Sequence, residues 1–148
     1  MSEDKKYAGF SIRILAGILD LIVLLPPLLI FAFAFLSLDF SDTASLLKNI
    51  SQYENEINLI SLIITIPYLT YFVSSNSQAT LGKRMLRIYV GNLDGSKLSK
   101  KRSLARSLMS VVTSSTLGIG FLSVLITKER ISLHDFIYKT RVFYKQKI

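Results

Sequence analysis

The chain of 148 residues contains no cysteine and a single histidine, His134. The lack of cysteine excludes disulfides, thiolate catalysis and cysteine-based zinc sites, and one histidine provides too few ligands for a histidine-based metal site. No nucleophile paired with a base and no glycine-rich phosphate loop is present, so we identify no catalytic residue. We expect a protein that is not an enzyme and that uses no metal or cofactor.

Acidic residues are also scarce, because ten Asp and Glu face eighteen Lys and Arg, which gives a net charge of +8. Half of the residues are apolar, more than a soluble domain of this length usually contains. The apolar excess is expected to face lipid, and the positive charge to lie at a membrane surface rather than in a groove for nucleic acid. We therefore expect the lipid bilayer, and not nucleic acid, as a partner.

Two apolar runs are long enough to cross a bilayer, which takes roughly 20 residues. The first extends from 14 to 36 with Asp20 as its only charge, and it is longer than the apolar part of a signal peptide. The second, from 57 to 73, is shorter and contains Pro67. These runs predict membrane-spanning helices at about 12–36 and 57–74.

A third run, from 104 to 126, has a polar and glycine-containing middle between Thr113 and Gly120. The connection 37–56 is acidic, whereas the segments 75–102 and 128–148 are basic, and basic segments of membrane proteins stay in the cytoplasm. A single crossing by the third run would separate the two basic segments. We therefore predict a helical hairpin at about 103–127, with both termini cytoplasmic.

Two short segments rich in β-branched and aromatic residues lie in the basic regions, at Arg87–Val90 and Arg141–Tyr144. We predict that they pair as strands, with Asp94-Gly95 as the turn after the first. The alternative is that both are loose interfacial segments. The expected fold is a single all-α membrane domain over residues 1–148, with two transmembrane helices, the hairpin and a small cytoplasmic two-strand element.

Asp20 carries the clearest functional signal, because a charge inside an apolar span is costly and needs a partner or a proton. Arg13 lies about 10 Å away along the same helix and leans toward its N-terminus, so we expect it to reach the headgroups. We predict that Asp20 pairs with Arg106 at the start of the third run, where Ala16 and Gly17 would allow close packing. The pair could hold the helices together or take part in proton or cation exchange.

Asp135 follows Ser132 by three residues, which is the spacing of a helix capping box. We predict that Ser132 caps a short helix and that Asp135 reaches back to it, with a salt bridge to Lys83 or Arg84 as a compatible addition. A relay role for Asp135 is the alternative. His134 could titrate near neutral pH, but a lone histidine beside a cap more often packs or lies at the surface.

A basic cluster lies directly before the third run, where such clusters bind anionic lipid head groups. Its members are Lys97, Lys100, Lys101 and Arg102.

The sequence resembles the RDD family in four places, spread in the expected order from about residue 7 to 143. They are Gly9-Phe-Ser-Ile-Arg13, Thr80-Leu-Gly-Lys-Arg84, Leu133-His-Asp135 and Thr140-Arg-Val-Phe143. The family is named after an arginine at the start of the first membrane helix, an aspartate within that helix and a second aspartate. The resemblance places these at Arg13, Asp20 and Asp135, and it implies a polytopic bacterial membrane protein, for some of whose relatives ion transport has been proposed.

Two functions follow as hypotheses. The first is a component of ion or small-solute transport in a bacterial inner (plasma) membrane, with Asp20 and Arg106 lining a polar path in a homo-oligomer. The second is a non-catalytic scaffold or assembly factor, in which Arg13, Asp20, Arg106 and Asp135 are structural.

Overall fold

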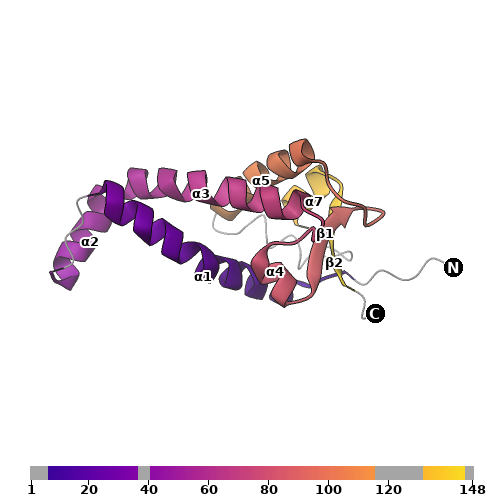
Figure 1. Cartoon of the computed structure of the whole chain (residues 1–148), viewed down its shortest axis with the longest axis horizontal. Coiled ribbons are helices and arrows are strands. Elements are labelled where there is room, and N and C mark those ends of the chain that lie inside the picture. The colour runs from indigo at the N-terminus through magenta and orange to yellow at the C-terminus, as the bar shows by residue number, and fades with distance from the viewer. Residues whose placement is uncertain (1–6, 37–40, 116–131, 146–148) are drawn as a thin grey trace.

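The computed structural model describes residues 7–36, 41–115 and 132–145. Two long helices, α1 (Phe10–Phe35) and α3 (Glu54–Ser74), run side by side along the length of the molecule (Figure 1). Both are long and apolar enough to cross a membrane, and most of their surface is exposed in the isolated chain. A helix is thus present at each of the two predicted spans, with bounds that differ by a few residues.

At one end of these helices lies α2 (Thr43–Gln52), within a region that we predicted to be a simple connection. The Asp42 carboxylate starts this helix by accepting a hydrogen bond of 2.7 Å from the backbone N–H of Ser45. The sequence pattern missed it because α2 is short and carries both polar and apolar side chains.

The remaining elements gather at the other end, where α1 begins and α3 ends (Figure 1). They are α4 (Leu81–Met85), β1 (Ile88–Asn92), α5 (Lys100–Ser115), α7 (Leu133–Ile137) and β2 (Thr140–Tyr144). Helix α5 lies along α3, and α4 packs against α1. We call α4, α7, the two strands and the first turns of α5 the end layer.

The predicted strand pair is present, since β1 and β2 form an antiparallel sheet in which Val90 pairs with Val142. The first strand begins at Ile88, because Arg87 has a left-handed backbone (φ 53°) that reverses the chain after α4. The predicted turn at Asp94-Gly95 is also present, with Gly95 at φ 82° and its N–H donating to the Asn92 carbonyl at 2.8 Å.

The predicted hairpin of the third run can be followed only in its first half. Helix α5 is continuous to Ser115, so the residues Ser114 and Ser115, where we placed the start of the turn, are helical. Residues 116–127 of the predicted hairpin lie outside the described residues.

The apolar core of the described chain lies between the sheet and the adjoining ends of α1 and α3. Its buried members are Ala8, Ala16, Val73, Ile88, Val90, Leu98 and Val142. The N-terminal segment adds to the sheet, because Tyr7 bridges to Phe143 and the Ala8 N–H donates to the Val142 carbonyl at 2.9 Å. The beginning of the first membrane helix is therefore attached to the last strand.

Candidate functional site

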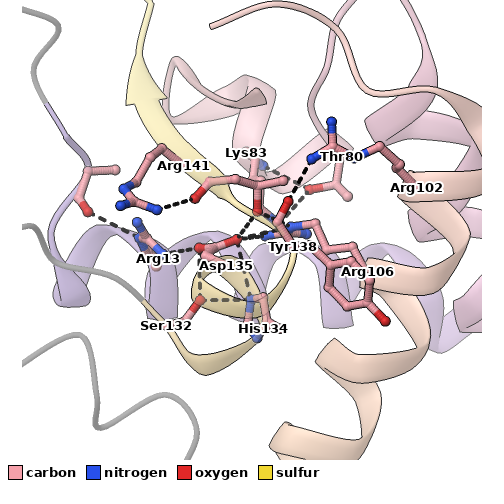
Figure 2. A network of polar contacts seen from close by, with 12 residues as sticks. Arg13, Thr80, Lys83, Arg102, Arg106, Ser132, His134, Asp135, Tyr138 and Arg141 are labelled. Atoms are coloured by element: carbon pink, nitrogen blue, oxygen red, sulfur yellow. Dashed lines mark hydrogen bonds and ion pairs between the residues drawn. The ribbon is translucent and has the colours of Figure 1, made fainter. Parts of the chain in front are cut away.

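Asp135 on α7 is the centre of a buried charge network in the end layer (Figure 2). Its Oδ2 accepts hydrogen bonds from Arg13 Nη1 at 2.7 Å and from the Ser132 hydroxyl at 2.8 Å. Its Oδ1 accepts from Arg106 at 2.6 Å (Nη2) and 3.0 Å (Nε), and from the Thr140 hydroxyl at 2.9 Å. One fully buried carboxylate thus joins α1, α5, α7 and β2.

Two guanidinium groups flank this carboxylate, which decides its protonation. Burial alone would raise the pKa of Asp135, but the surrounding donors and positive charge, with Arg106 the largest contributor and Arg13 among the others, outweigh burial and hold the pKa well below its usual range. Asp135 is therefore ionised throughout the physiological pH range. A buried carboxylate that is ionised and hydrogen-bonded on both oxygens is a structural anchor.

His134 is also buried, and its Nε2 lies 2.9 Å from the Ser132 hydroxyl. Burial, reinforced by the charge of Arg106, lowers the pKa of His134 to about 3. The imidazole is therefore neutral at physiological pH. Because the Ser132 hydroxyl donates to Asp135, it accepts the Nε2–H of His134. His134 is thus a buried packing residue, one of the two roles that the sequence favoured, and not a sensor near neutral pH.

Asp20, the acid inside α1, has a separate set of partners. Its Oδ1 accepts from the Tyr68 hydroxyl and from the backbone N–H of Gly82, both at 2.7 Å. Its Oδ2 accepts from the Thr80 hydroxyl at 2.6 Å. Asp20 therefore binds the N-terminus of α4, where free backbone N–H groups attract a carboxylate.

Lys83 on α4 completes this second cluster. Its Nζ lies 3.9 Å from Asp20 Oδ2 and 3.4 Å from the Thr80 hydroxyl, and the side chain is 17% exposed. Burial lowers the pKa of Lys83 to about 8, although the charge of Asp20 opposes the shift. The amine can therefore release its proton at mildly alkaline pH.

The predicted pair of Asp20 with Arg106 is wrong, as each binds a different partner. The prediction failed because residues 80–85 were expected only as part of the basic cytoplasmic segment 75–102, whereas they form α4, which occupies the surface of α1 beside Asp20. The expectation that Arg13 reaches the headgroups is also wrong. Arg13 is 4% exposed and is held by Asp135 and by the Ala8 carbonyl, which accepts from its Nε at 3.1 Å.

The predicted capping box is correct only in its position. Ser132 is the N-cap residue of α7, but its side chain makes no capping hydrogen bond. Its hydroxyl donates to Asp135 instead, and Asp135 binds two arginines rather than Lys83 or Arg84. Charge pairing across the chain has replaced the local cap.

Two members of the predicted lipid-binding cluster hold the end layer together. Arg102 donates to the Asn92 side chain and to the Tyr138 carbonyl, both at 2.7 Å, and Lys97 donates to the Asn76 side chain at 3.0 Å. Lys100 and Lys101 are exposed at the start of α5. Lipid binding by this cluster stays a prediction.

Sequence reasoning did not single out Tyr68, Thr80 or Thr140 as site residues. Thr80 could have been found, because a threonine at the start of a short polar segment is a helix N-cap signal, and its hydroxyl accepts from the Lys83 N–H at 3.4 Å. Tyr68 gave no such signal, since its partner is 48 positions away.

Among the described residues, no group of three or more His, Cys, Asp or Glu could hold a metal ion. The two apolar helices, each long enough to span a bilayer, indicate an α-helical membrane protein. The chain belongs to the RDD family, whose model matches residues 7–139. It is 29% identical over 151 residues to the uncharacterized protein YxaI of Bacillus subtilis (strain 168), with 95% of this chain and 99% of that protein covered. No solved structure matches it significantly.

Proposed function

We propose that this protein is a non-catalytic scaffold or assembly component of a bacterial cytoplasmic membrane, in which the buried charges fasten the end layer to two spanning helices. The observation that carries the proposal is the saturation of both buried carboxylates. Every oxygen of Asp20 and Asp135 accepts hydrogen bonds from the chain itself. A transported cation would have to displace these donors, and doing so would detach α4 or α7.

We further propose that the end layer and both termini face the cytoplasm. The positive-inside rule supports this, because the basic segments 75–102 and 128–148 flank the layer while the connection 37–56 is acidic. The bridge between Tyr7 and Phe143 supports a common side for the two ends. Reporter fusions after Ile148 should read as cytoplasmic and fusions within α2 as external; an external reading after Ile148 would contradict the arrangement.

The bilayer is the main partner in this proposal, and no nucleic acid is involved. Lys100 and Lys101 are available to anionic head groups because their side chains are exposed. A homo-oligomer would use the exposed apolar faces of α1 and α3, which carry side chains such as Leu21 and Ile63.

Transport is the second candidate function, and one observation favours it. Asp20 and Lys83 bring an acid and an amine with a pKa of about 8 to within 3.9 Å at the end of two spanning helices. Intramembrane acids beside such groups can exchange protons. In this alternative, the pair would line a path at the centre of a homo-oligomer.

Proteoliposomes separate the two candidates. We expect the purified protein to show no proton-coupled cation flux, and Asp20→Asn to lower thermal stability, because its amide cannot accept all three hydrogen bonds equally well. Glu56→Gln, an exposed acid at the start of α3, is the matched control. Flux that is present in the unmodified protein and in Glu56→Gln but lost in a folded Asp20→Asn variant would establish transport and overturn the scaffold proposal.

A further inference from the structure

Because α4 packs against α1, the part of α1 that it contacts sets the depth of α4 in the membrane. A Cβ atom added at Gly82 would clash with the Ala16 carbonyl oxygen and lie 2.9 Å from the Asp20 nitrogen. The backbones of α4 and α1 therefore touch, and neither lipid nor water fits between them. Helix α4 therefore lies beside residues 16–20 of α1.

Residues 16–20 lie deeper along α1 than the point at which its apolar surface begins. Ile14, Leu15 and Ile18 are exposed apolar side chains of a helix that is long enough to span, so the bilayer begins close to Arg13. Asp20 follows Arg13 by seven residues, which is about 10 Å at the rise of an α-helix. An element attached at Asp20 therefore lies among the upper acyl chains and not in water.

The free surface of α4 has the composition that this depth requires. Met85 is 66% exposed, and it is accompanied by the exposed side chains of Arg84 and Arg87. In water, an exposed methionine side chain buries no apolar surface and adds nothing to stability, whereas acyl chains would remove it from water. Long arginine side chains can reach from such a depth to the phosphate groups. Apolar and basic side chains side by side are characteristic of segments that lie in a membrane interface.

Arg87 is held in place by the backbone. Its left-handed conformation is unfavourable for a residue other than glycine, so the surrounding structure must hold it. Its carbonyl accepts a hydrogen bond of 2.7 Å from the Lys145 N–H, which fixes the reversal between α4 and β1. The edge formed by Arg84, Met85 and Arg87 is therefore preorganised by the fold.

From these observations we propose that α4 is the part of the end layer that is immersed in the adjoining leaflet, and that Arg84, Met85 and Arg87 form a binding edge for an anionic phospholipid. The acyl chains cover Met85, and the two guanidinium groups bind the phosphate, which they can do with paired N–H donors. This assigns lipid recognition to α4 rather than to Lys97 and Arg102, whose donors bind protein atoms. The proposal rests on α1 spanning the bilayer.

The absence of cysteine makes the depth directly measurable, because one introduced cysteine carries one nitroxide label. The variants are Met85→Cys, Ile18→Cys as the lipid reference and Leu93→Cys as the water reference. Leu93 is 54% exposed in the turn after β1, which projects beyond the helices in Figure 1. In phosphatidylcholine vesicles containing phosphatidylglycerol, we expect the label at position 85 to collide with oxygen, as at position 18, and to be shielded from a water-soluble nickel chelate.

A label at position 85 that is as accessible to nickel as the one at position 93 would overturn the immersion of α4. If the label at position 18 is also accessible to nickel, α1 does not span, and the proposed membrane function fails together with this inference. The chain also lacks tryptophan, so Met85→Trp gives an independent reading through quenching by brominated lipids.

Headgroup recognition is tested in the Met85→Trp background by comparing quenching by brominated phosphatidylglycerol and brominated phosphatidylcholine. Arg84→Gln with Arg87→Gln should lower the preference for phosphatidylglycerol by about tenfold, because each basic residue near a surface adds appreciable attraction. Lys139→Gln with Lys145→Gln, two exposed lysines beside β2, is the charge-matched control and should leave the preference unchanged. An unchanged preference in the arginine variant, or an equal loss in both variants, would overturn a specific edge on α4.

Discussion

Arg13 and Asp135 stand 122 positions apart in the sequence and form an ion pair of 2.7 Å between Nη1 and Oδ2. This pair joins the first turn of the first membrane helix to a short helix near the end of the chain. Because Arg106 binds the other oxygen of the same carboxylate, a single acid balances two buried cations. The first arginine and the second aspartate of the family resemblance are thus direct partners, whereas Asp20 works separately, at the N-terminus of α4.

The two arginines predict the cost of losing Asp135. Asp135→Asn should lower stability in detergent by about 3–5 kcal/mol, because it leaves two guanidinium groups buried without a counter-charge. Ser132→Ala should cost only about 1 kcal/mol, since it removes one hydrogen bond. Thermal unfolding measures both, with Glu56→Gln as the exposed control. If Asp135→Asn unfolds at the same temperature as Glu56→Gln, the network does not stabilise the fold.

Gly82 predicts a steric effect with a matched control in the neighbouring helix. Gly82→Ala should destabilise the protein, because the new methyl group meets backbone atoms of Ala16 and Asp20, which cannot move aside. Gly17→Ala should be neutral or stabilising by up to about 1 kcal/mol, because nothing lies within 4 Å of the added atom and alanine favours the helix. Equal melting temperatures for the two variants would contradict the contact between α4 and α1.

Tyr68 predicts the strength of the contact between α3 and Asp20. Its hydroxyl donates to Asp20 at 2.7 Å and accepts from the Leu81 N–H at 3.1 Å, so Tyr68→Phe breaks two hydrogen bonds. We expect a loss of about 1–3 kcal/mol, together with faster amide exchange at Leu81. Tyr71→Phe is the control, since that side chain is largely exposed. Unchanged exchange at Leu81 would show that Tyr68 does not hold α4.

The low pKa of His134 predicts that the folded protein becomes less stable in acid. The pKa of His134 is about 3 in the folded chain and 6.5 in the unfolded chain. Between these values the unfolded state binds the proton and the folded state does not, so stability falls as the pH is lowered from 6.5 toward 3. His134→Gln should weaken this fall in melting temperature. A His134→Gln profile that parallels the unmodified one would mean that this imidazole does not titrate with unfolding.

Lys83 predicts a change of the same sign at alkaline pH. Its pKa falls from 10.5 in the unfolded chain to about 8 in the folded chain. The unfolded state therefore holds more protons between pH 8 and 10.5, and stability rises with pH across this window. Across this window, the melting temperature of the unmodified protein should rise relative to that of Lys83→Met. The exposed Lys101→Met should instead change in parallel with the unmodified protein. A constant difference would exclude the shift.

The spans and the strand pair could be predicted because their signals are local. A run of roughly 20 apolar residues predicts a helix long enough to span a bilayer, and α1 and α3 are found at the two predicted positions. The β-branched and aromatic residues around Val90 and Val142 identified two strands that pair as expected. Helices α2 and α4 were missed, because each is short and depends on a cap or a neighbour rather than on apolar periodicity.

The partners of the buried charges could not be predicted in the same way. The sequence identified Asp20 as a costly charge that needs compensation, but it paired Asp20 with Arg106. It also placed Arg13 at the head groups and Asp135 in a local helix cap. Residue type specifies that a buried acid requires donors, and it does not specify which donors lie within 3 Å. Gly82, whose missing side chain admits α4 to the surface of α1, decided that Asp20 would meet Thr80 and not Arg106.

The sequence by itself predicted two apolar helices long enough to span a membrane, an excess of basic residues in the segments at one end of them, and an acid within the first helix, Asp20, that needs a partner. These properties follow from composition and from the cost of placing charges in an apolar medium, neither of which depends on the fold. Only the tertiary structure decided that Asp135 joins Arg13 to Arg106 and that Asp20 binds α4. Such pairings depend on the close approach of segments distant in sequence, and a contact of a few ångströms is fixed only when the helices and strands pack together.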